Sequence, residues 1–153
     1  MTSSRSAVFE ELVRFNRAQH LLRQFGDLPG AAMPLLAQVI KSGPLRSRQL
    51  AELSCLDPST VSRQIDQLVR AGLVERLADP DDGRATLLHA TATGQERFQA
   101  HRRQIEALLT DTLFREWSQT DLHTFTTLLR RLNDEAMEQL PHLARGYRAA
   151  TSD

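Results

Sequence analysis

The chain has 153 residues, close to the size of one domain, with 41% hydrophobic and 25% charged residues. This balance excludes a disordered chain, and the 19 basic and 19 acidic side chains, which cancel, exclude a uniformly basic, histone-like binder. No apolar run reaches the roughly 18–20 residues of a membrane span, the N-terminus lacks the apolar stretch of a signal peptide, and one cysteine forms no internal disulfide. We therefore expect one cytoplasmic domain without a membrane anchor.

The first third of the chain predicts three helices. Apolar side chains recur at helical spacing over residues 5–25, and a second helix is expected over 32–42, after a Gly- and Pro-containing break. A short third helix is expected over 48–54, with Ser47 as its N-cap. Cys55 follows it, and we expect a small buried side chain there.

Residues 57–71 carry the clearest helix signal. Asp57 followed by Pro58 is a typical helix start, and Gly72 supplies the left-handed residue that ends a helix. Apolar residues at i, i+4, i+7 and i+8 form one stripe for packing, whereas the opposite face carries hydroxyl, amide and guanidinium groups.

The remaining residues predict a hairpin and two long helices. Short strands over 73–77 and 85–90 flank a polar, turn-rich loop. Amphipathic helices are expected over 91–117 and over 118–140, the second beginning with a Ser-Gln-Thr-Asp capping box and ending before a proline. The tail from His142 is expected to fray.

This order of elements predicts a mainly α fold with a small β-hairpin, organised as a single domain over 1–153. Residues 44–91 form a compact unit between two outer helical regions, 1–30 and 92–141, which we expect to fold together. Wide apolar stripes on the outer helices favour a two-fold dimer that covers them, and a self-contained helical domain is the alternative.

The compact unit has the form of a helix-turn-helix followed by a hairpin, which is a winged helix. A helix of this diameter fits the DNA major groove, where short polar side chains reach base edges. Ser59 and Thr60 lie in the first turn, where backbone N–H groups and the helix dipole attract phosphate. Arg63 and Gln67 lie one turn apart and suit guanine and adenine. The residues expected to hold the DNA backbone on either side are Arg48, Arg70 and Arg76.

The hairpin loop places three acids, Asp79, Asp81 and Asp82, beside Arg84. Three carboxylates are unfavourable near a phosphate backbone, so we expect one or two of them to pair with Arg84 and Arg76 and fix the loop. Arg84 is then presented to a narrow minor groove, where negative potential is concentrated. A solvated turn without DNA contact is the alternative.

Residues 45–94 resemble the winged-helix core of the MarR family, the multiple antibiotic resistance regulators. The matching motifs are Gln-Leu-Ala-Glu at 49–52, Ser-Thr-Val-Ser-Arg at 59–63, Leu-Val-Arg-Ala-Gly-Leu-Val-Glu-Arg at 68–76, Asp-Pro-Asp-Asp-Gly-Arg at 79–84 and Thr-Ala-Thr-Gly at 91–94. The wing motif in register with the helix-turn-helix is specific, whereas the flanking helices match in length and placement only.

The resemblance implies an obligate homodimer, built from the first and the last two helices, that reads a pseudo-palindromic operator in double-stranded DNA. The DNA contacts that it implies are Ser59, Thr60, Ser62, Arg63, Gln67 and Arg84. It also carries an Asp–Arg wing brace onto Asp82 and Arg84, with Arg76 near.

Small aromatic or phenolic ligands are common effectors of that family. The resemblance places their site where the dimer-forming helices meet the winged helix, around Arg17, His20, Gln24 and His101. The alternative is that Arg17 and His20 pair with Glu96 or Glu106. The histidines show no metal-ligand spacing, so no metal and no cofactor are expected.

No nucleophile elbow, phosphate-binding loop or nucleophile–base pair stands out, so we do not expect an enzyme. We predict a sequence-specific DNA-binding transcriptional regulator, a homodimeric repressor released from its operator by a small molecule or a chemical signal. The alternative is a winged-helix protein-interaction module without specific DNA binding.

Overall fold

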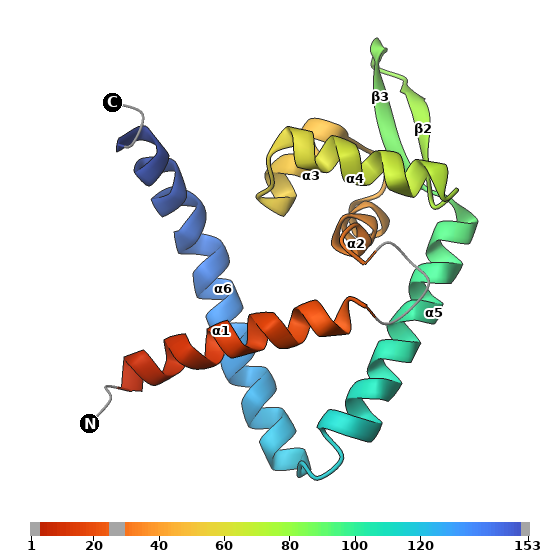
Figure 1. Cartoon of the computed structure of the whole chain (residues 1–153). Helices are drawn as coiled ribbons and strands as arrows, with labels where there is room; N and C mark the ends of the chain where they lie inside the picture. Colours follow the sequence, from red (N-terminus) through yellow and green to blue (C-terminus); the bar gives the residue numbers. More distant parts are fainter. Residues whose placement is uncertain (1–3, 25–29, 151–153) are drawn as a thin grey trace. The chain divides into compact units, whose positions relative to one another are not determined.

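The computed structural model describes residues 4–24 and 30–150 and is mainly helical with one small antiparallel sheet, which confirms the predicted fold class (Figure 1). The helices are α1 (Ser4–Leu22), α2 (Met33–Ser42), α3 (Ser47–Ser54), α4 (Pro58–Arg70), α5 (Ala92–Leu108) and α6 (Gln119–Ala150). The strands are β1 (Leu45–Arg46), β2 (Val74–Asp79) and β3 (Asp82–Ala90), and a π-helical turn η1 covers Leu109–Leu113. The chain divides into two compact units, residues 1–107 and 108–153.

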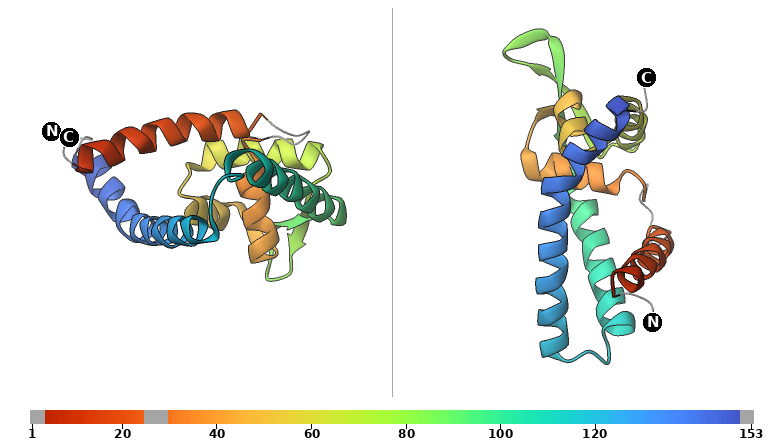
Figure 2. Two further views of the ribbon diagram at one scale, coloured as in Figure 1. Left: turned by 90° about the horizontal axis from the view of Figure 1, so that it is seen from below. Right: turned by 90° about the vertical axis from the view of Figure 1, so that its left-hand side faces the viewer.

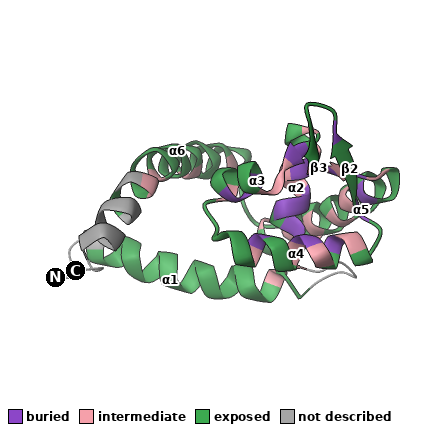
Figure 3. Cartoon of the chain, turned by 90° about the horizontal axis from the view of Figure 1, so that it is seen from above, coloured by how far each residue is buried: buried purple, intermediate pink, exposed green. Residues whose placement is uncertain are grey.

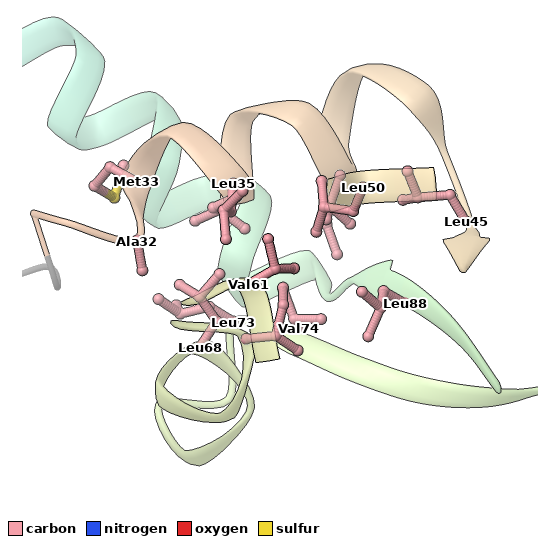
Figure 4. Packing of buried hydrophobic residues seen from close by; sticks show 14 of the residues in the cluster. Ala32, Met33, Leu35, Leu45, Leu50, Val61, Leu68, Leu73, Val74 and Leu88 are labelled. Atoms are coloured by element: carbon pink, nitrogen blue, oxygen red, sulfur yellow. The ribbon is translucent and has the colours of Figure 1, made fainter. Parts of the chain in front are cut away.

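The core of the first unit is aliphatic and lies between α2, α3, α4 and the sheet. In Figure 4, Leu35 and Leu50 face Val61 and Val74, with Leu88 of β3 beside them. All five side chains are less than 3% exposed. Burying one such side chain contributes about 1.5–3 kcal/mol, so this cluster holds the helix-turn-helix and the sheet together as one body.

The three strands pair antiparallel in the order β1-β3-β2, and the β2–β3 hairpin extends away from the helices α2 to α4 (Figures 1 and 2). The predicted seven-residue loop over 78–84 is wrong, because β2 runs to Asp79 and β3 begins at Asp82. Strand β1 was not predicted from the sequence. Two residues are too short for a period-two pattern, and β1 exists because Leu45 and Arg46 pair with Leu88 and Leu87 of β3.

The start of α5 is fixed to the base of the hairpin. The Thr91 hydroxyl donates to the Gly72 carbonyl at 2.7 Å and accepts the Gly94 N–H at 2.9 Å, and the Thr91 N–H donates to the Leu73 carbonyl at 3.1 Å. A Cβ at position 94 would overlap that same Leu73 carbonyl oxygen. The Thr-x-x-Gly motif is therefore explained by a close approach of α5 to the residue before β2.

The ends of the short helices agree with the sequence except around α3. Asp57 caps α4, Pro58 is its first residue, and Gly72 has a φ of +69°, all as predicted. Ser47 is the first residue of α3 and not its cap. Arg46 takes that position, with its N–H donating to the Gln49 side chain at 2.9 Å.

Cys55 is exposed, so the prediction of a buried side chain is wrong. It ends α3 in the left-handed conformation with a φ of 53°, and the only other described residues with positive φ are glycines. The turn between α3 and α4, and not core packing, determines the environment of this residue.

The predicted helix over 91–117 is interrupted. Helix α5 ends at Leu108 and is followed by η1, instead of continuing to Trp117. Three aromatic rings then cluster, with Trp117 in edge contacts to Phe114 at 5.1 Å and to Phe125 at 5.3 Å. These contacts hold the residues before α6 against its first turns, whereas a straight helix through 117 would separate Phe114 from Phe125.

The start of α6 is as predicted and its end is not. The Ser118 hydroxyl accepts the Asp121 N–H at 3.1 Å, and the Asp121 carboxylate accepts the Ser118 N–H at 3.2 Å, which is a capping box. The helix then continues through Pro141 to Ala150 instead of ending at Leu140 and fraying. A proline removes one backbone hydrogen-bond donor from a helix, but Pro141 does not end α6.

Burial is uneven along the chain (Figure 3). Buried side chains gather on α2, α3, α4 and the sheet, whereas α1 and α6 are exposed along most of their described length. None of the described helices is long and apolar enough to cross a membrane. Residues 1–3 and 25–29 lie outside the described part. The first helix was predicted to reach residue 25, which is among them, but α1 already ends at Leu22.

Candidate nucleic-acid interface

The outward face of α4 is polar and open to solvent. Its inward stripe, formed by Val61, Ile65 and Leu68, is fully buried, and this fixes the rotation of the helix about its own axis. The exposed side chains on the opposite side are Ser59, Ser62, Arg63, Gln67 and Arg70. Thr60 is half-buried. The folding of the core thus gathers the predicted α4 residues, apart from Thr60, on one exposed face.

Asp57 already occupies the N-terminus of α4. Its carboxylate accepts the Ser59 hydroxyl at 2.5 Å and the Thr60 N–H at 2.9 Å. These hydrogen bonds, the one from Ser59 first, hold the pKa of the Asp57 carboxyl well below its usual range. The negative charge of Asp57, and the N–H and hydroxyl donors that it already binds, weaken the attraction of this helix end for a phosphate.

Two of the predicted backbone-holding arginines are engaged within the protein. Arg48 pairs with Glu52 one turn along α3, with 3.1 Å between Nε and Oε1. Arg76 on β2 pairs with Asp66 on α4, with 2.8 Å between Nη2 and Oδ1. The second pair ties the hairpin to the helix, whereas the first lies on the exposed surface and is easily exchanged for another anion.

Arg63, Arg70 and Arg84 belong to no ion pair among the residues that the structure describes. All three are exposed. An unpaired, exposed guanidinium retains its five donors for planar acceptors such as guanine or phosphate.

Arg84 lies in a bulge near the tip of the hairpin. The last two residues of β2 pair with Thr86 and Asp82 of β3, so residues 83–85 are left outside the ladder. Arg84 is the middle residue of this bulge, and its N–H donates to the Asp82 carboxylate at 3.1 Å. A bulge changes the direction of the side chains that it carries, and the Arg84 side chain is exposed.

The wing acids pair with Arg46 and not with Arg84 or Arg76, which corrects the predicted brace. The Arg46 guanidinium lies 2.6 Å from the Asp79 carboxylate and 3.7 Å from that of Asp82. Asp82 does support the wing, but through the backbone N–H of Arg84 and not through an ion pair with its side chain.

The Asp79 carboxylate is the one buried charged group among the described residues, at 5% exposure. One oxygen accepts the Asp81 N–H at 2.9 Å, and the other accepts Arg46 Nε at 2.7 Å. These two interactions, in that order, lower the pKa of the Asp79 carboxyl, and the same pairing raises the pKa of Arg46. A buried carboxylate is expensive unless it is paired, so the acid stays charged and fixed.

Sequence reasoning did not identify Arg46 because it lies 33 positions before Asp79. Only the pairing of β1 with β3 brings the two together, and the two-residue strand was itself not predicted. The one sequence feature that could have pointed to Arg46 was its position next to the predicted short helix.

The predicted effector residues do not gather around a described cavity. Arg17, His20 and Gln24 are exposed, and His101 on α5 has a buried Nδ1 without a hydrogen-bond partner among the described groups. Neither Glu96 nor Glu106 pairs with Arg17 or His20 among the described ion pairs, and Glu106 pairs with Arg102 at 2.7 Å.

A cavity of about 410 Å³ instead lies in the first unit against α2, α3 and α4. Its walls are Arg23, Ala31, Pro34, Leu35, Gln38, Ser54, Leu56 and Gln64. The side-chain oxygen of Gln64 is buried without a described hydrogen-bond partner. The lining is half apolar and half polar, and its one charged group is the Arg23 guanidinium.

The known proteins that this chain resembles are transcriptional regulators. The family model described as MarR family matches residues 32–86. An uncharacterized HTH-type transcriptional regulator of Bacillus subtilis, YxaD, is 35% identical over 112 residues, which cover 72% of this chain and 77% of that protein. A mutant MarR of Escherichia coli complexed with operator DNA has a TM-score of 0.66 at 22% identity, over 80% of this chain and 91% of that one. The PcaV transcriptional regulator of Streptomyces coelicolor in complex with its natural ligand has a TM-score of 0.62 at 26% identity, over 82% and 90%.

Proposed function

This chain belongs to the MarR family of transcriptional regulators, and on that premise we propose that it is a homodimeric, sequence-specific DNA-binding repressor whose operator affinity is lowered by a small ligand. One observation carries the proposal. The exposed polar face of α4 and the bulge with Arg84 belong to one compact unit, and both present guanidinium groups that bind no described partner. A repressor bound to the chromosome works in the cytoplasm.

We assign the reading of bases to Arg63 and Gln67 in the major groove. Arginine pairs with two acceptors of guanine, and glutamine pairs with adenine in the same manner. Ser62 lies on the same face, and Arg70 at the end of α4 suits a phosphate. Arg84 takes the minor groove beside the half-site, where a narrow groove attracts a guanidinium.

The apolar surface supports the homodimer. On α1, Phe9 is 68% exposed, and on α6, Leu128 and Leu143 are 59% and 65% exposed. Soluble monomers rarely leave such stripes uncovered, so we propose that a second copy covers them. Two winged helices in such a dimer read half-sites about 34–36 Å apart, one turn of DNA.

The cavity beside α4 supports release by a ligand. Its apolar residues, such as Leu35 and Leu56, and the Arg23 guanidinium suit a small aromatic acid or a phenol, and Gln64 in its wall belongs to α4 itself. A ligand that binds one placement of α4 better than another shifts the population between them and changes operator affinity. The assignment of Arg17, His20, Gln24 and His101 to effector binding stays a prediction.

Titration of duplex DNA with Arg63→Ala tests the assignment of α4. We expect the variant to lose about ten- to a hundredfold in affinity for a selected operator and little for random duplex, because a bidentate base contact contributes about 1–3 kcal/mol of discrimination. Arg131→Ala on α6, which removes another exposed arginine, is the control. Equal loss on both duplexes would reduce Arg63 to a phosphate contact. No specific binding by a folded wild type would favour the protein-interaction module.

A further inference from the structure

Arg46 touches the helix-turn-helix, the sheet and the tip of the wing. Its backbone pairs with Leu87 of β3 and caps α3, and its guanidinium reaches Asp79 and Asp82 at either side of the hairpin turn. The turn is otherwise an extension of β2 and β3 beyond the end of β1. Among the described residues, the ion pairs that join this turn to the rest of the unit are those of Arg46 with Asp79 and Asp82.

The connection continues to the DNA-facing side chain. Arg46 holds one oxygen of Asp79, whose other oxygen accepts the Asp81 N–H inside the turn. Arg46 also lies 3.7 Å from Asp82, whose other oxygen accepts the Arg84 N–H. Two carboxylates thus transmit the position of one guanidinium to the backbone on both sides of the tip.

The charges at the wing tip also indicate a role for Arg46. Asp79 and Asp82 bring two negative charges close to the place where DNA phosphates would lie, and Arg46 neutralises part of that charge from within the protein. The Asp79 side chain is 4% exposed and that of Arg46 is 43% exposed, so the pair is only partly screened by water.

We propose that Arg46 is a positioning residue for DNA recognition, which fixes the wing tip relative to the helix-turn-helix so that Arg84 is presented to the minor groove. This inference rests on the proposed function and goes beyond it. Arg46 itself makes no DNA contact, and its effect passes through Arg84.

The test combines operator titration with amide hydrogen exchange, and it uses Arg46→Met, Arg84→Ala and the double variant in the full chain. The titrated duplex is the sequence that the wild type enriches from random DNA. We expect Arg46→Met to weaken operator binding about tenfold, and the double variant to bind no worse than Arg84→Ala alone. In the free protein, exchange at the Asp81 and Arg84 amides should rise in Arg46→Met.

Two further variants keep the result interpretable. Arg46→Met leaves the Asp79 carboxylate buried without its cation, so the pair Arg46→Met/Asp79→Asn removes both charges and should fold while the wing stays unanchored. Arg46→Lys restores one charge without the planar fork and should recover only part of the affinity. Arg131→Met is the matched control, since it breaks an exposed ion pair on α6.

The inference is overturned if Arg46→Met binds the operator as tightly as the wild type, or if its loss adds fully to that of Arg84→Ala, since Arg46 would then contact DNA directly. Unchanged exchange at Asp81 and Arg84 also overturns it. A folded wild type that enriches no duplex overturns the proposed function instead, and with it the role of Arg46 in DNA recognition.

Discussion

Cys55 is strained by the turn that it occupies. Its φ of 53° is typical of glycine, and a residue with a Cβ in this conformation costs about 1–2 kcal/mol. We therefore expect Cys55→Gly to raise the free energy of unfolding by about 0.5–1 kcal/mol, the relief being reduced by the entropy that glycine loses on folding. Urea denaturation measures it. Cys55→Ala retains the Cβ and should show no gain, and an equal gain in both variants would contradict the strain.

Asp57 gives α4 a charge-dependent cap. Because its pKa is lower in the folded than in the unfolded chain, its charge stabilises the fold above the ordinary carboxyl pKa of about 4, and this stabilisation is lost as the pH falls through the folded value. Asp57→Asn retains a neutral acceptor. We expect the variant to be less stable than the wild type at neutral pH, with the difference shrinking below about pH 4 in urea denaturation at several pH values. A difference that is constant with pH would contradict this role.

At the scale of elements, local signals predicted the helix-turn-helix well. The Asp-Pro start of α4, the left-handed Gly72 and the Ser118 capping box act within four residues, so they can be read directly from the sequence. Interactions between distant residues were missed. Strand β1 exists through its pairing with β3, and the ring contacts of Trp117 with Phe114 and Phe125 join residues on both sides of the break before α6.

At the wing, too, local features were predicted and a contact between distant residues was missed. The residues at the tip were identified from composition, but their partner was not. Asp82 and Arg84 lie two positions apart in the sequence, so their pairing was expected. The arginine that binds the acids, Arg46, comes from another strand. The sequence near the wing did not show which arginine pairs with these acids, because the pairing depends on how the strands are arranged.

The junction of α5 with the base of the wing gives a prediction at this scale. Gly94→Ala places a methyl group against the Leu73 carbonyl, where backbone and not a flexible side chain must move. We expect a loss of about 1–3 kcal/mol in the free energy of unfolding, measured by urea denaturation. Gly83→Ala on the wing is the control, because nothing lies within 4 Å of the added methyl group, and it should change stability by at most about 0.5 kcal/mol. Similar losses in both would contradict the close approach.

For the whole molecule, the sequence indicated apolar outer helices and a chain without net charge. The structure adds that Leu132 on α6 is 41% exposed. A helix rotates by about 100° per residue, so Thr127 lies about 140° around α6 from Leu132, on the other side of the helix. We predict that Leu132→Glu dissociates the dimer, because two charges would be buried in the interface. Sedimentation equilibrium measures the mass.

Thr127→Glu introduces the same charge on the other side of α6 and should leave the dimer intact. The wild type is expected at twice the mass of the chain at micromolar concentration. A wild-type monomer, or dissociation by Thr127→Glu alone, would contradict the placement of the dimer interface on the apolar side of α6.

The central claim is that the chain reads DNA as a dimer through α4 and Arg84. The most direct measurement is selection of bound sequences from random duplex DNA by the purified wild type and by Arg84→Ala, after both are shown to be folded. The account predicts that the wild type enriches an inverted repeat with centres about one helical turn apart, and that Arg84→Ala enriches it weakly or not at all. Enrichment of no sequence by the folded, dimeric wild type, or of an unpaired site, would contradict it.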